Sequence, residues 1–159
     1  MGIRCITSVG DIEALMIQIQ DIVYEEILNA LAYLGEQCVT RIRDRSAQES
    51  WIDHTGNLRS SIGYGVYAKG KKYMESTFES VLSGSTGSST GRRYLESLSS
   101  QYANTYALVV VAGMSYADYV EAIDSKDVLA STELWAKSEV QKYLDMAKEK
   151  AIKRINQLR

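Results

Sequence analysis

A long helical pattern of apolar residues near the N-terminus constrains the fold most strongly. The pattern runs from Asp11 to about Arg45, with an apolar residue every three or four positions, as one face of an amphipathic helix requires. Proline inside a helix kinks or breaks it, and the 159 residues include no proline. Ser8 and Asp11 form a cap of the S-x-x-D type. The stripe consists of Ile12, Leu15, Ile19, Ile22, Val23, Ile27, Leu31, Leu34, Cys38 and Ile42.

The other end of the chain predicts a second long helix. Apolar residues recur at helical spacing over residues 132–158, and Ser131 stands at the cap position. The last turns are rich in lysine and arginine, which complement the negative end of the helix dipole. The two termini of the chain therefore form long helices.

The middle of the chain predicts a small sheet. Residues 58–82 alternate in polarity and turn at Gly70, which indicates a β-hairpin. Residues 83–91, "SGSTGSSTG", contain no apolar side chain and predict a flexible loop. Residues 92–130 predict a short helix, a strand at "YALVVVAG" and a connecting segment. The unbroken apolar run of that strand indicates a central position, buried on both faces. We therefore expect a single α+β domain over residues 1–159, with a small, mostly antiparallel sheet flanked by the N-terminal helix (11–45) and the C-terminal helix (132–158).

Composition disfavours several classes of function. The net charge is −2, whereas a dedicated nucleic-acid binder is usually basic. A minor nucleic-acid-binding module that uses Arg41, Arg45 and the basic C-terminus stays as an alternative. Two cysteines, Cys5 and Cys38, are too few for a disulfide framework or a cysteine zinc cluster. No apolar run approaches the length of a membrane span. We expect no cofactor, no metal and no membrane contact.

One motif suggests an enzyme. "GMSYA" places Ser115 between a predicted strand and a helical turn, as in the nucleophile elbow of serine hydrolases. The motif ends in Ala117 instead of glycine, and His54, the only histidine, precedes the serine instead of following it. A small serine hydrolase is therefore an alternative, and we expect no catalytic residue.

Two further features favour assembly. Gly63 and Gly65 share one face of a predicted strand, and a bare face lets a helix or a neighbouring subunit approach closely. The chain has eleven tyrosines and one phenylalanine. Tyrosine suits surfaces that are only partly buried, such as subunit interfaces, although a tyrosine-rich core explains the same count equally well.

Three motifs, taken in order, resemble one protein family. "TGNLRSSIGY", "YALVVVAGMSYADYVEA" and "DVLAS" before a C-terminal helix are similar to segments of the head–tail joining, or tail-completion, proteins of long-tailed bacteriophages. The resemblance covers residues 10–158. The chain departs from the family after "YVE", where "AIDSKDVL" replaces a glycine and a proline-containing segment.

The resemblance implies a structural virion protein without catalytic activity. Such subunits form a ring of six at the neck, between portal, connector or stopper proteins and the tail-tube protein, after synthesis in the host cytoplasm. DNA passes through the ring without being read. In this setting the glycine face, the tyrosines and the loop 83–91 make contacts on assembly. The candidate interface residues are Gly63, Gly65, Tyr67, Tyr116, Tyr119, Glu121, Ser83, Gly87 and Gly91.

Overall fold

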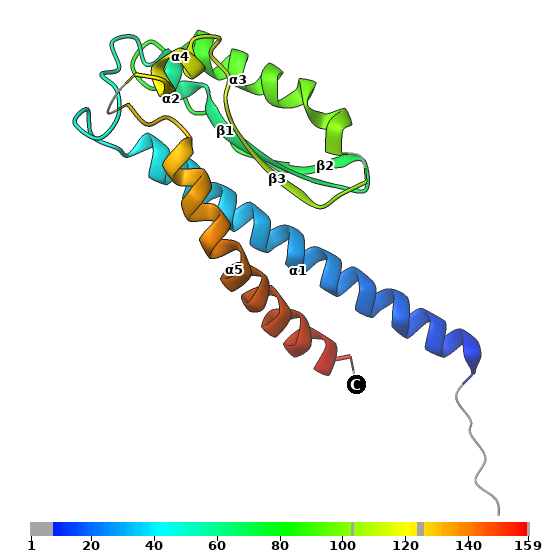
Figure 1. Ribbon diagram of the computed structural model, residues 1–159. Coiled ribbons are helices and arrows are strands. Elements are labelled where there is room, and N and C mark those ends of the chain that lie inside the picture. Colours follow the sequence, from blue (N-terminus) through cyan, green and yellow to red (C-terminus); the bar gives the residue numbers. More distant parts are fainter. Residues whose placement is uncertain (1–7, 103, 124–125, 159) are drawn as a thin grey trace, which may run out of the picture.

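The α+β class is confirmed by a computed structural model, which describes residues 8–102, 104–123 and 126–158. A three-stranded antiparallel sheet lies between α1 on one face and α3 on the other, and α5 packs along α1 (Figure 1). The elements are α1 (Val9–Arg43), α2 (Asn57–Ser60), β1 (Ile62–Ala68), β2 (Lys71–Glu75), α3 (Ser85–Ser97), the 3₁₀ helix η1 (Ser99–Tyr102), β3 (Ala107–Ala112), α4 (Ala117–Glu121) and α5 (Ala130–Asn156).

The N-terminal helix begins where its cap predicts. The Ser8 side chain accepts a hydrogen bond from the backbone N–H of Asp11 at 3.1 Å, and the Asp11 carboxylate accepts one from the backbone N–H of Ser8 at 3.2 Å. This reciprocal pair satisfies two N–H groups that a helix leaves unpaired at its start. The hydrogen bonds also hold the pKa of the Asp11 carboxyl below its usual value.

The position predicted for the third strand is wrong. The strand order is β2-β1-β3, so β1 is central and β3 lies at an edge. β3 is nevertheless apolar on both faces, because Val109 and Val111 pack in the cluster with α3 while Leu108 and Val110 pack towards α1 and α5. Helices on both faces cover the strand, although Ala107, Leu108 and Val110 are only partly buried. An unbroken apolar run therefore indicates two covered faces and does not indicate a central position.

The hairpin is shorter than predicted. Residues 57–60 form the short helix α2 instead of strand, and the second strand ends at Glu75 instead of continuing towards residue 82. The turn falls at Gly70, which has a φ of 76° that glycine adopts at little cost. In the predicted connecting segment, residues 126–131, "KDVLAS", contain no strand and lead directly into α5.

The predicted flexible loop is also wrong, because most of it belongs to α3. Glycine disfavours a helix by about 1 kcal/mol relative to alanine, which explains the sequence-based expectation. Gly87 and Gly91 are buried on the inner side of α3. A side chain at Gly87 would overlap the Asn57 carbonyl, and one at Gly91 would overlap the Ser61 carbonyl. The glycines thus let the α3 backbone pack directly on the backbone of α2 and the start of β1.

The two long helices extend beyond the sheet. Figure 1 shows α1 continuing past the sheet and past the end of α5. We call residues 9–26 of α1 and 143–156 of α5 the stem. We call the three strands, α2, α3 and residues 28–43 of α1 the sheet region.

Candidate assembly surface

The predicted glycine face is internal. Gly63 and Gly65 are buried, and side chains there would collide with Phe78 and crowd Leu95 of the same chain. Tyr67 is 1% exposed, and its hydroxyl donates to the Leu95 carbonyl at 3.0 Å. The sequence allowed a helix or a neighbouring subunit on this face, and the structure places Leu95 of α3 against Gly65 and Phe78, which precedes α3, against Gly63. Gly63, Gly65 and Tyr67, with Gly87 and Gly91, are therefore not available as interface residues in the folded chain.

Three other predicted interface residues lie on the surface. Tyr119 on α4 is 72% exposed and Tyr116, just before α4, is 39% exposed. Ser83 is exposed, and its hydroxyl donates to the Thr55 carbonyl at 3.3 Å. These side chains do not form one patch with the buried glycines, so the predicted interface divides into an internal part and a surface part.

Glu121 has a structural role that the sequence did not indicate. Its carboxylate accepts hydrogen bonds from the backbone N–H groups of Val128, Leu129 and Ala130 at 3.1, 2.7 and 3.1 Å. These donors belong to the start of α5, which a carboxylate stabilises through both hydrogen bonding and the helix dipole. Glu121 thus caps α5 from a distant position, in place of the predicted cap at Ser131.

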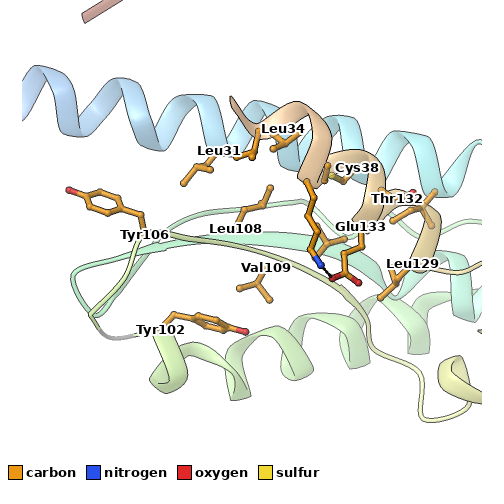
Figure 2. A pocket seen from close by; sticks show the side chains of 15 residues that line it. Leu31, Leu34, Cys38, Tyr102, Tyr106, Leu108, Val109, Leu129, Thr132 and Glu133 are labelled. Atoms are coloured by element: carbon orange, nitrogen blue, oxygen red, sulfur yellow. Dashed lines mark ion pairs between the residues drawn. The ribbon is translucent and has the colours of Figure 1, made fainter. Parts of the chain in front are cut away.

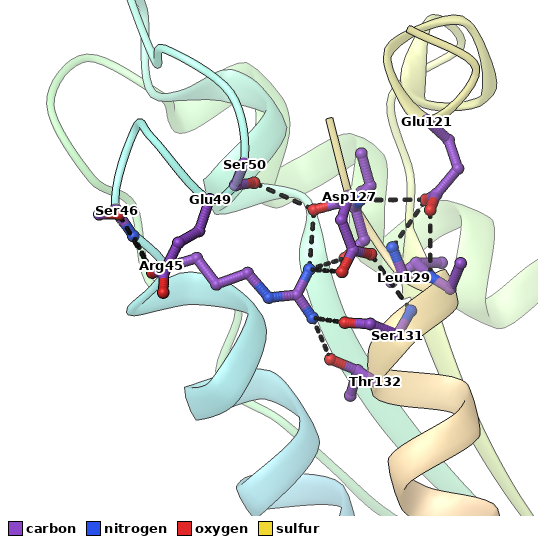
Figure 3. A network of polar contacts seen from close by, with 11 residues as sticks. Arg45, Ser46, Glu49, Ser50, Glu121, Asp127, Leu129, Ser131 and Thr132 are labelled. Carbon is purple, nitrogen blue, oxygen red and sulfur yellow. Dashed lines mark hydrogen bonds and ion pairs between the residues drawn. The ribbon is translucent and has the colours of Figure 1, made fainter. Parts of the chain in front are cut away.

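Arg45 joins the end of α1 to the start of α5 (Figure 3). Its guanidinium pairs with the Asp127 carboxylate at 3.0 Å and donates to the Asp127 carbonyl at 2.7 Å. It also donates to the hydroxyls of Ser131, at 2.9 Å, and Thr132. Burial favours a higher pKa for the Asp127 carboxyl, but hydrogen bonds from Ser131 and the charge of Arg45 outweigh burial and leave that pKa lowered. This network fixes where α5 leaves the sheet region.

The stem exposes an apolar stripe that no described residue covers. Ile12, Met16, Ile19 and Val23 follow one another at helical spacing on α1, in line with Ala30 and Leu34. Ala30 and Leu34 pack against α5, whereas Figure 1 shows the N-terminal turns of α1 beyond the end of α5. The exposed fractions in this part of α1 are 73% for Val9, 48% for Ile12, 44% for Leu15, 56% for Met16 and 58% for Ile17.

A groove runs between α1 and α5 where the stem meets the sheet region. It has a volume of about 300 Å³ and is lined by Glu26, Asn29, Ala30, Tyr33, Tyr143, Met146, Ala147 and Lys150. The alanines leave room between the helices, and Tyr33 is 55% exposed at its edge. Glu26 is buried at this position and pairs with Arg154 at 2.8 Å, so its charge is compensated inside the chain. The groove is therefore an open, largely apolar site with Lys150 at its margin.

The free edge of β3 lies beside a second groove, of about 520 Å³. Figure 2 shows Leu108 and Val109 pointing to opposite sides of the strand, with Leu31, Leu34 and Cys38 of α1 above the groove. Glu133 and Lys137 of α5 form an ion pair at its margin, at 2.5 Å. Burial raises the pKa of the Cys38 thiol to about 11, so this thiol stays protonated and unreactive at neutral pH.

The residues that suggested chemistry do not come together. Ser115 and His54 are both exposed, and among the residues that the structure describes no hydrogen bond joins them. In the same part of the chain, no group of three histidine, cysteine or acidic side chains is arranged to hold a metal ion. None of the described helices has the length and apolar character needed to cross a lipid bilayer.

Comparison with known proteins gives no match among family models, curated proteins or solved structures. A function for the chain is therefore inferred from its own sequence and geometry.

Proposed function

We propose that the chain is a structural subunit of the neck of a long-tailed phage or prophage, where it forms a ring that joins the DNA-filled head to the tail. The observation that carries an assembly role is the stem, where five large apolar side chains near the N-terminal end of α1 lie exposed among the described residues, at positions 9, 12, 15, 16 and 17. Large exposed apolar surfaces typically mark sites of protein association. The sequence resemblance supplies the neck as the place of assembly.

The family motifs support the proposal through their roles in the fold. Gly56 is buried with a φ of 77° at the start of α2, where a side chain would overlap the Val81 carbonyl. Arg59 pairs with Asp53 at 3.2 Å and lies over the Trp51 ring. Glu121, from the "YVE" motif, caps α5. These residues stabilise one particular arrangement of α2, α4 and α5. The motifs that contain them therefore indicate a shared fold, and none of these contacts belongs to a catalytic site.

The alternatives have weaker support. A hydrolase needs a base within hydrogen-bonding reach of its nucleophile, and Ser115 has no such partner among the described side chains. For nucleic-acid binding, Arg45 is engaged in the network at α5 and Arg41 lies over the Trp135 ring, 5.2 Å from its centroid. Neither arginine extends freely towards a phosphate backbone.

The proposal is tested in a phage or prophage that encodes the chain. We expect deletion of its gene to leave filled heads and separate tails, and electron microscopy of complemented particles to show a ring of the protein at the neck, between connector and tail tube. A Ser115→Ala variant should complement the deletion fully. Heads and tails that join normally without the protein would overturn the proposed function.

A further inference from the structure

The two helices of the stem differ in charge. Residues 9–40 of α1 contain six acidic residues and no lysine or arginine. Residues 142–156 of α5 contain five basic residues, Lys142, Lys148, Lys150, Lys153 and Arg154, and only two acidic ones, Asp145 and Glu149. One helix of the stem is therefore acidic and the other basic.

Part of this complementarity is used inside the chain. Arg154 pairs with Glu25 and Glu26, each at 2.8 Å, and ties the last turns of α5 to α1. Lys148, Lys150 and Lys153 are exposed and form no ion pair with other described residues. The same holds for Glu13 and Asp21 on the α1 side. Among the described residues, opposite charges therefore stay unpaired on the α1 side and on the α5 side of the stem.

The apolar surfaces match as well. The α1 stripe of Ile12 and Met16 continues the row that α5 covers further along the helix, at Ala30 and Leu34. The groove between α1 and α5 is lined by Ala30, Ala147 and Met146, with Lys150 at its margin. A helix whose apolar stripe is bordered by acidic residues fits such a groove, because side chains enter between the alanines while charges of opposite sign meet at the margin.

We propose that residues 9–21 of one copy of the chain pack in the α1–α5 groove of a second copy. Ile12 and Met16 enter the groove, and Glu13 and Asp21 meet Lys150 and Lys153 at its margins. The inference rests on the proposed function as an assembly subunit and names the contact that assembles it. Because two different surfaces meet, the contact is heterologous, and its repetition closes into a ring when the rotation per copy divides a full turn.

Charge reversal on each side, and on both sides together, tests the contact in the purified full-length chain. The acidic side is changed by Glu13→Lys with Asp21→Lys, and the basic side by Lys150→Glu with Lys153→Glu. Sedimentation velocity up to the highest soluble concentration measures self-association. We expect each double variant to associate about tenfold more weakly or worse, and the fourfold variant to recover association, because the pairs re-form with opposite signs. Added salt should weaken association of the unchanged chain.

Arg93→Glu serves as the matched control, since Arg93 is an exposed basic residue of α3, away from the stem, and should leave association unchanged. Circular dichroism of every variant checks that α1 and α5 remain folded. The contact would be overturned by double variants that associate as the unchanged chain does, by a fourfold variant no better than either double variant, or by a chain that stays monomeric throughout. Either of the first two results would overturn the contact and leave the proposed neck function intact. Normal particles after deletion of the gene would overturn the neck function itself, whatever the contact between copies.

Discussion

The sheet region and the stem share the helix α1 but differ in how the chain covers it. In the sheet region Leu28, Leu34 and Ile42 are at most 2% exposed, since the sheet and α5 lie against them. In the stem Ile12 and Met16 of the same helix are about half exposed, although the apolar pattern of the sequence is the same. A continuous stripe on one helix can therefore serve two purposes, with one part forming the core and the other left for a partner.

The largest expected difference between the two regions comes from truncating one residue in each. Leu34→Ala should lower the free energy of unfolding by about 3 kcal/mol, because it leaves a cavity in a buried cluster. Met16→Ala should change it by less than about 0.5 kcal/mol, because the side chain is exposed in the monomer. Urea unfolding of dilute protein measures both. Equal losses at the two positions would mean that the stem stripe is covered within the monomer.

A smaller effect is expected where α3 packs on the sheet region. Gly91→Ala should destabilise the chain by about 2 kcal/mol, because the added methyl group overlaps the Ser61 carbonyl and moves α3 outward. Ser89→Ala, on the exposed side of the same helix, is the control and should be neutral or slightly stabilising. Thermal unfolding distinguishes them. A Gly91→Ala variant as stable as the control would mean that the α3 backbone does not pack closely on the sheet region at its glycines. Residues 83–91 would then be available as the flexible assembly loop that the sequence predicted.

The junction between the two regions should show the smallest loss. Glu121→Ala removes the acceptor for three backbone N–H groups at the start of α5 and should cost about 1.5 kcal/mol. Glu133→Ala removes only an exposed pair with Lys137 and should cost no more than about 0.5 kcal/mol. Chemical denaturation compares the two variants. A Glu121→Ala variant as stable as Glu133→Ala would show that the Glu121 carboxylate does not stabilise the start of α5.

Sequence patterns predicted the helices better than the contacts between elements. The stripe and the Ser8–Asp11 cap predicted α1 closely, because both signals are local. The same reasoning placed β3 at the centre of the sheet and made residues 83–91 a loop. Both errors have one cause. Each segment packs against an element that is distant in the sequence, and local propensity contains no information about such a contact.

The candidate interface could be predicted only in part. Tyr116 and Tyr119 are exposed, whereas Gly63 and Gly65 face Phe78 and Leu95 of the same chain. The stem was not proposed from the sequence as an interface, although a signal existed. The apolar stripe of α1 begins at Ile12, and α5, with 27 residues against 35 for α1, is too short to cover all of it once Arg45 fixes where α5 starts.

Amide hydrogen exchange, compared between dilute monomer and concentrated protein, reports on the sheet region and the stem in one measurement. Exchange in β1 should be slow in both samples, since this central strand opens only with the whole fold. Amides of residues 9–21 should exchange rapidly in the monomer and become protected on association, when a second copy covers the stem. Protection that appears elsewhere on association, with residues 9–21 unchanged, would contradict the account of the stem as the assembly surface.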